Sequence, residues 1–462
     1  MSVAGLAAGG RVRTFASRHA AALYGMIGRL WIILTGPLTI VFLAIYFTPD
    51  AQGYFLTFIA LAAARNVAEL GLGQVIIVKI AQLHSLAADQ ADEAAAQVAG
   101  LIRFTAKWFA GAGLLISVVL AVSGSVLLGT GKGLPVGEWL PPWLALSFLV
   151  GIDLALSGLL YPLEGAGQVR SVYFGRMVRS FINSLVLWSF ILLGFQLWSL
   201  SAGLAASLIW IAGFLLIKGR LVIEALRPDA VVTKIDWLSE VLPAQWRIAL
   251  SSIAEYFSFY TVIPLMYVMH GAVVAGQLGV TWQLALAVSS MAGAFVVARL
   301  PEFSRLVGAR AFRELDALLL STSLISMAVC LVGALGVGLC VLVIDRTGMA
   351  VAARLLPLHE VAIMLFGVLI WHFNLTIVAY LRAHGGDPYL PASLTGAVLL
   401  FAANVTLGQW FGPEGLLWGY TLIGACIMVP FSFYLLLRKR STCGYPSFKV
   451  EGNWMALLTK LR

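Results

Sequence analysis

One arginine and one glutamate lie where a membrane-spanning helix should be apolar. They are Arg65 and Glu69, within the stretch 48–74, which reads TPDAQGYFLTFIALAAARNVAELGLGQ. A lone Arg at the centre of a bilayer costs about 2.5–3.5 kcal/mol on insertion scales. Glu69 follows one helical turn later, where it can form an i,i+4 ion pair with Arg65. A guanidinium in this setting can also bind a phosphate through its fork of N–H groups.

Two interpretations of this pair stay open. In the first, Arg65 and Glu69 only neutralise each other inside the protein. In the second, their face of the helix lines a wet cavity and meets a charged substrate, since intramembrane ionisable residues commonly face a water-filled path. We favour the second because similar residues recur elsewhere at about the same depth.

These recurring residues are Asp153, Glu255 and His372, the last accompanied by Asn374. Counted back from the cytoplasmic ends of their predicted spans, Glu69, Asp153, Glu255 and His372 lie about 12–15 Å deep, at 1.5 Å per residue. Arg65 lies deeper, at about 21 Å. We predict a polar vestibule open to the cytoplasm, with Arg65 as its innermost cation. Taken singly, each of these residues could equally be a satisfied interior residue.

Arg29 and Arg247 begin the predicted first and seventh spans from the inside, at corresponding places in the two halves. Ordinary positive-inside anchoring explains them. The functional alternative is a mouth that gathers anionic head groups, because basic residues between spans bind lipid phosphates on that side.

The composition predicts the kind of element that positions these residues. The chain is 61% hydrophobic and 11% charged, with a mean hydropathy of +0.94, which is typical of an integral membrane protein. The net charge of +9 is explained by basic loops rather than by nucleic acid, and the four Cys have no zinc-like or disulfide-like spacing. We expect no metal site and no cleavable signal. The run that carries Arg65, 53–78, has 26 residues without Pro; as one helix it would extend roughly 39 Å.

Twelve apolar segments are long enough to span a bilayer: 30–47, 53–78, 104–128, 142–162, 180–196, 198–217, 247–270, 275–298, 317–344, 357–381, 389–410 and 415–437. With the N-terminus inside, 26 of the 30 Lys and Arg fall on the cytoplasmic side, 3 fall outside, and Arg65 lies in the membrane. This bias supports twelve spans with both termini cytoplasmic.

The spans divide into two equal sets. We predict a cytoplasmic tail (1–29), a six-helix lobe (30–217), a linker (218–246), a second six-helix lobe (247–437) and a basic cytoplasmic tail (438–462). Paired bundles of this kind, facing each other across a cavity, are typical of secondary transporters. The chain has no G-x-S-x-G, P-loop or H-E-x-x-H motif, which argues against ATP-driven transport by this chain alone and against common hydrolases.

Several sequence segments resemble those of one protein family. They are TPDAQGYF with AELGLGQVI, LEGAGQVRSVYFGRMVRS, QWRIALSSIAEYF, AGQLGVT, RLPEFSRL with FRELDALL, and YLRAHGGDPYLPASL. Together they resemble the bacterial polysaccharide-biosynthesis membrane proteins of the multidrug/oligosaccharidyl-lipid/polysaccharide (MOP) superfamily, similar to the Wzx-type O-antigen flippases. The resemblance covers about Arg29 to Arg440.

The resemblance implies an all-α, MATE-like fold of two lobes that alternates between inward- and outward-open states in the bacterial inner membrane. The implied cargo is an oligosaccharide on a polyprenyl diphosphate, bound by Arg65 and more weakly by Arg29 and Arg247, without a cofactor. In the related drug exporters, carboxylates of the first and seventh spans handle a coupling cation. The first span here, Leu30 to Phe47, has no carboxylate, whereas Glu255 leaves H⁺ or Na⁺ coupling open.

Our hypothesis is therefore a lipid-linked oligosaccharide flippase, not an enzyme, in which Glu69 holds Arg65 until cargo arrives. Its expected partners are the lipid-linked saccharide, membrane lipid and the polymerase or glycosyltransferase machinery. The alternatives are a drug or cation antiporter of the same fold and a glycan polymerase or ligase. The short outer loops argue against the latter.

Overall fold

The computed structural model describes residues 3–84, 91–131, 133–233, 235–384 and 389–442. Every regular element in these ranges is a helix. The N-terminal bundle contains α1 (Val3–Tyr46), α2 (Pro49–Ala62), α3 (Arg65–Glu69), α4 (Leu72–Leu83), α5 (Ala91–Val119), η2 (Leu120–Gly124), α6 (Ser125–Leu128), α7 (Val136–Gly158), α8 (Leu160–Gly165), α9 (Val169–Leu192), α10 (Trp198–Lys218) and α11 (Arg220–Leu226). The C-terminal bundle contains η3 (Trp237–Val241), α12 (Leu242–Glu255), η4 (Tyr256–Tyr260), α13 (Val262–His270), α14 (Ala272–Gly308), α15 (Phe312–Arg346), η5 (Ala350–Arg354), α16 (Leu358–Ala383), α17 (Leu390–Ile423), η6 (Gly424–Met428) and α18 (Val429–Thr442).

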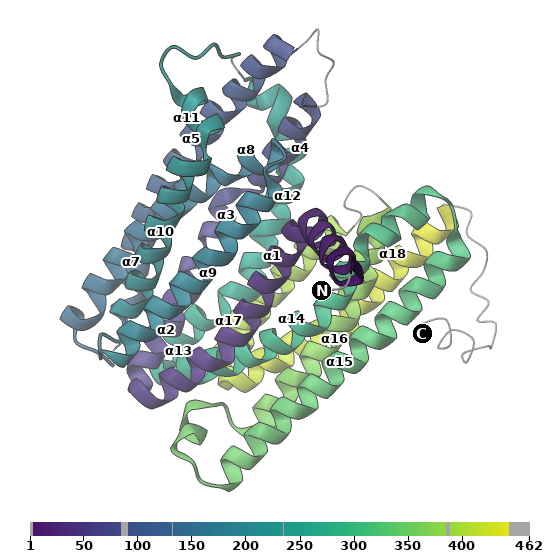
Figure 1. Cartoon of the computed structure of the whole chain (residues 1–462). Helices are drawn as coiled ribbons and strands as arrows, with labels where there is room; N and C mark the ends of the chain where they lie inside the picture. The colour runs from purple at the N-terminus through teal and green to yellow at the C-terminus, as the bar shows by residue number, and fades with distance from the viewer. Residues whose placement is uncertain (1–2, 85–90, 132, 234, 385–388, 443–462) are drawn as a thin grey trace.

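The two bundles form a V (Figure 1). They meet at the lower end of the view and diverge upwards, so that α4 and α11 are well separated from α18. At the closed end, α2 of the first bundle packs on α14 of the second. The backbones touch there, since a Cβ at Gly53 would lie 1.9 Å from the Ala272 carbonyl oxygen. The lack of a side chain at Gly53 therefore allows the bundles to close at this end.

The helices are long and apolar enough for a multi-pass membrane protein. Ten segments of the described chain meet the requirements for a membrane span. The predicted total of twelve would also need α9 to cross and the last segment, Leu390–Thr442, to cross twice. That segment is 53 residues long and is broken at Gly412, whose φ of 62° and ψ of −148° are not helical. The exact number of crossings and the cytoplasmic location of the termini stay predictions.

The second predicted span is interrupted, which corrects the expectation of one continuous helix over 53–78. Thr48 begins α2, because its side chain accepts a hydrogen bond from the Ala51 N–H at 3.2 Å and Pro49 follows at the first helical position. After α3, Leu70 and Gly71 both adopt left-handed conformations, with φ of 50° and 67°. Two such residues in succession end an α-helix, and α4 then starts in a new direction.

The fifth span begins earlier than predicted. Helix α9 starts at Val169, eleven residues before the expected 180–196 segment. Arg176 and Arg179, which we expected in a cytoplasmic loop, are therefore helical residues. The inside count of basic residues included them as loop residues, and this part of the prediction was wrong.

A short loop ties the two bundles together at the closed end. Arg354 of η5 donates through Nη2 to the Phe47 carbonyl oxygen at 2.5 Å, just after the end of α1. Gln52 donates back through Nε2 to the Arg354 carbonyl oxygen at 3.4 Å. Partial burial lowers the pKa of the Arg354 guanidinium from its ordinary value, but an arginine stays protonated at neutral pH.

Candidate functional site

The N-terminal bundle encloses a carboxylate held by two guanidiniums. Asp153 of α7 binds Arg65 of α3 through Oδ2 and Arg179 of α9 through Oδ1. Ser157 joins them, because its Oγ accepts from Arg179 Nη1 at 3.0 Å and donates to Asp153 Oδ1 at 3.3 Å. We call Arg65, Asp153, Ser157 and Arg179 the charge cluster.

The cations of the charge cluster are more exposed than its anion. The side chain of Asp153 is 2% exposed, whereas Arg65 is 25% and Arg179 is 19% exposed. In addition, Arg65 Nε is buried without a hydrogen-bond acceptor from the protein. The cluster therefore hides its carboxylate and leaves guanidinium donors for another acceptor.

A close contact between glycines of α5 and α7 helps to position Asp153. A Cβ at Gly151 would lie 2.2 Å from the Gly113 carbonyl oxygen, so α7 and α5 are in backbone contact two residues before Asp153. Helix α3 packs on both α5 and α7, which brings Arg65 to the carboxylate.

A second polar group lies near the charge cluster, on the side that we predict to be cytoplasmic. Tyr161 donates through its hydroxyl to Glu69 Oε1 at 2.7 Å. Arg176 Nη1 lies 2.9 Å from Glu164 Oε2, and its guanidinium is 5.6 Å from the centroids of both the Tyr161 and Tyr173 rings. Here too the cation is the more exposed partner, at 36% for Arg176 against 13% for Glu164.

The structure corrects the expected partner of Arg65. Arg65 binds Asp153 rather than Glu69, although Glu69 is one turn away on α3. Glu69 instead accepts from Tyr161. A buried carboxylate lacks water as an alternative partner, so Asp153 gains more from the guanidinium than the half-buried Glu69 would.

Sequence reasoning missed Arg176 and Arg179. A signal was present, since the segment from Val169 to Leu192 contains no Pro or Gly-Pro break that would delay the start of the helix. The three arginines of VRSVYFGRMVRS lowered its hydropathy and shifted the predicted start to residue 180.

The expected single layer of ionisable groups does not form one vestibule. His372 is 1% exposed and its Nε2 hydrogen-bonds the Ser326 Oγ inside the C-terminal bundle. Asn374 is 4% exposed; it donates through Nδ2 to the Tyr389 hydroxyl at 2.9 Å and accepts from Ser432 Oγ at 2.5 Å. Both residues are core residues, because packing of α16 against α15, α17 and α18 surrounds them, and the prediction that they line the vestibule was wrong.

Glu255, Arg29 and Arg247 are exposed side chains. Arg247 lies with its guanidinium 5.3 Å from the Trp246 ring centroid. None of the three contacts the charge cluster, and their roles in coupling or head-group binding stay predictions. The described residues contain no group of three His, Cys, Asp or Glu that could hold a metal ion.

Sequence comparison matches neither a family model nor a curated protein, whereas the three-dimensional comparison does. An inward-facing multidrug resistance transporter of the MATE family aligns with a TM-score of 0.69 and 14% identity, over 93% of this chain and 99% of that one. The lipid II flippase MurJ, in an inward closed conformation, aligns with a TM-score of 0.65 and 12% identity, over 92% and 88%. The chain has the fold of the MOP-superfamily transporters.

Two further structures align with lower TM-scores. An outward-facing MATE transporter aligns with a lower TM-score of 0.54 at 14% identity, over 91% and 96% of the two chains. A MOP-superfamily transporter from Pyrococcus furiosus, described as having a binding pocket of reverse polarity, aligns with a TM-score of 0.54 and 14% identity, over 92% and 96%. At these identities the likeness shows the fold alone, so the predicted MATE-like fold is confirmed and the Wzx-type resemblance stays a prediction.

Proposed function

We propose that this protein is a flippase that moves a polyprenyl-diphosphate-linked oligosaccharide across the bacterial inner membrane by alternating access. The fold is that of transporters, and one protein of the same fold is a lipid II flippase. The observation that carries the proposal is the charge cluster, in which two partly exposed guanidiniums share one sealed carboxylate.

This arrangement favours an anionic cargo. Asp153 already accepts from Arg65, Arg179 and Ser157, so it has little capacity left for a cationic substrate. Arg65 and Arg179 retain unused N–H donors, and a diphosphate can accept several such hydrogen bonds at once. In the mechanism that we propose, Arg65 neutralises phosphate while Asp153, rather than Glu69, holds Arg65 in place between cargoes.

The V shape suggests how an amphipathic cargo passes. The saccharide and diphosphate would enter between the bundles at the open end, while the polyprenyl chain stays in the lipid. Rocking of the bundles would then separate α2 from α14 and open the other side. Glu255 is available for H⁺ or Na⁺ coupling, and polysaccharide-assembly enzymes would supply and consume the lipid-linked saccharide.

A drug or cation antiporter is the second candidate, favoured by the likeness to MATE transporters. Such a protein needs carboxylates that a cation can reach. Here the predicted first span, 30–47, has none, and Asp153 is sealed behind two arginines. Glu255 is exposed, but it is a single carboxylate outside the charge cluster. For one protein of this fold, a binding pocket of reverse polarity has been described as suggesting a different function.

The test is leaflet exchange of a fluorescent polyprenyl-diphosphate saccharide in proteoliposomes. Arg65→Ala should reduce exchange about 10- to 100-fold, because a hydrogen bond to a charged group contributes about 1.5–3 kcal/mol. Arg220→Ala removes an exposed arginine outside the cluster and should leave exchange unchanged. Normal exchange by Arg65→Ala would exclude the proposed site, and efflux of a cationic dye without saccharide exchange would favour the antiporter.

A further inference from the structure

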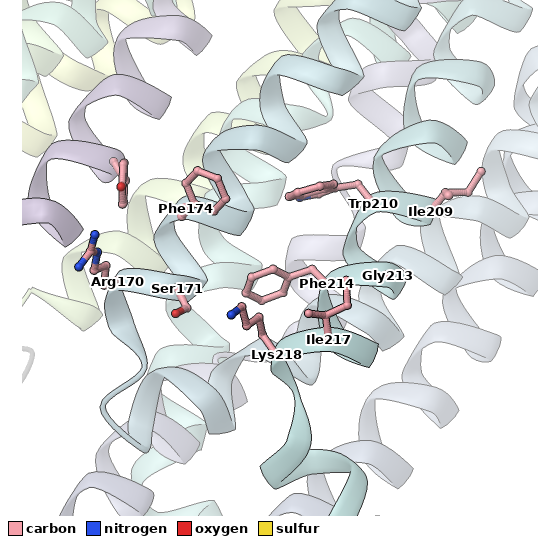
Figure 2. A pocket seen from close by; sticks show the side chains of 10 residues that line it. Arg170, Ser171, Phe174, Ile209, Trp210, Gly213, Phe214, Ile217 and Lys218 are labelled. Carbon is pink, nitrogen blue, oxygen red and sulfur yellow. The ribbon is translucent and has the colours of Figure 1, made fainter.

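A cavity of about 530 Å³ lies between α1, α9 and α10 of the N-terminal bundle (Figure 2). Its walls are mostly apolar. Phe174 projects from α9, and Trp210 and Phe214 project from α10 towards it (Figure 2). Trp210 is fixed in place because its Nε1 donates to the Gly175 carbonyl oxygen of α9 at 3.0 Å.

The lack of a side chain at Gly213 leaves space in the wall of the cavity. Gly213 lines it, and a Cβ built at this glycine would meet nothing within 4 Å. Isoleucines border the opening, and Ile209 and Ile217 are 74% and 76% exposed. A surface of this kind in a multi-pass membrane protein faces lipid chains rather than water.

Two cations lie at one end of the cavity. Arg170 is in the first turn of α9 and Lys218 is the last residue of α10, and Figure 2 shows both beside Ser171. The ten lining residues include no carboxylate. Within the part of the chain that the structure describes, neither Arg170 nor Lys218 forms an ion pair, and both are exposed. This end is therefore positively charged, on the side predicted to be cytoplasmic.

The cavity is separate from the charge cluster. At about 100° per residue, Phe174 lies roughly 40° from Arg170 around α9, whereas Arg179 lies about 180° away and Arg176 about 120° away. The cavity and these two arginines thus lie on different faces of the same helix.

We propose that this cavity binds one anionic glycerophospholipid of the cytoplasmic leaflet. One acyl chain would occupy the apolar part beside Gly213, and the phosphate would lie between Arg170 and Lys218. The two cations match the phosphate of such a lipid, and the apolar walls match its acyl chain. Basic pockets between spans on the cytoplasmic side are known to bind anionic head groups. This site does not depend on the proposed cargo, because it uses none of the residues of the charge cluster.

The experiment is native mass spectrometry of the full-length protein with defined lipids. We expect one phosphatidylglycerol to be retained and phosphatidylcholine to bind far less. Arg170→Gln with Lys218→Gln should weaken retention roughly 30-fold, since each basic residue near the surface contributes about 1 kcal/mol, or about fivefold. Gly213→Leu keeps both cations but fills the cavity, and it should also abolish retention.

The control is Arg299→Gln with Arg313→Gln, which removes the same charge from exposed sites of the C-terminal bundle and should leave retention unchanged. Equal phosphatidylglycerol retention by the wild type and both cavity variants would overturn the proposal. Equal binding of phosphatidylcholine would also overturn it. Displacement of phosphatidylglycerol by an equimolar polyprenyl diphosphate would instead assign the cavity to the cargo.

Discussion

At the scale of single residues, one buried carboxylate is the counter-charge of two guanidiniums. Asp153 is sealed and depends on Arg65 and Arg179, while each arginine keeps some access to its surroundings. Removing a buried carboxylate from such a group is more harmful than removing one arginine, because two guanidiniums are then left without a counter-charge.

Asp153→Asn should therefore destabilise the protein by about 3–5 kcal/mol, seen as a large drop in the thermal unfolding midpoint in detergent. Glu302→Gln, which breaks an exposed pair with Arg299, should cost about 1 kcal/mol or less. Combining Asp153→Asn with Arg179→Gln should recover part of the loss, because one uncompensated charge is removed. Additive losses in the double variant would contradict the shared-carboxylate arrangement.

Arg65→Lys tests the chemistry of the same site. A lysine keeps the positive charge but loses the planar fork, so we expect saccharide exchange between that of the wild type and that of Arg65→Ala. The measurement is the initial exchange rate at equal protein insertion. A rate for the lysine variant equal to that of the wild type would show that only charge matters.

At the scale of elements, the break in the second span decides where Arg65 lies. Gly71 has a left-handed φ of 67°, and a Cβ on it would be 2.2 Å from Ile248 Cγ2 of α12. A side chain is thus disfavoured twice, by the backbone conformation and by contact with the other bundle.

Gly71→Ala should cost about 1–2 kcal/mol from backbone strain alone, plus a steric cost against Ile248. Ile248→Ala in the same chain should relieve only the steric part. Gly36→Ala is the matched control, because a Cβ at Gly36 meets nothing within 4 Å and alanine favours the helix. Thermal unfolding of these three variants and of the unmodified protein measures both contributions; a Gly71→Ala protein as stable as the Gly36→Ala protein would show that the break is not required.

At the scale of the whole molecule, the closed end is formed by backbone contact between α2 and α14 and by the Arg354 hydrogen bond to Phe47. Both must be broken if the protein opens on that side. A larger side chain at Gly53 would oppose closure without touching the charge cluster.

Gly53→Leu should therefore shift the population towards the state that is open at the α2–α14 end. Spin labels at positions 220 and 313, on the two bundles at the diverging end, should report shorter distances in this variant than in the unmodified protein. Gly111→Leu is the matched control, because a Cβ there meets nothing within 4 Å. An unchanged distance distribution in Gly53→Leu would mean that this contact does not govern the state.

The sequence by itself determined the membrane class, the two-bundle helical fold and the presence of buried charge at Arg65 and Asp153. Hydropathy and charge bias report such features directly, because each residue in lipid carries its own transfer cost. The sequence did not determine which charges pair. Arg65 and Asp153 are 88 residues apart in the chain, and their contact depends on the break at Leu70–Gly71 and on how α3, α7 and α9 are rotated about their axes. Periodicity defines the faces of a helix, but only packing against its neighbours decides what each face meets.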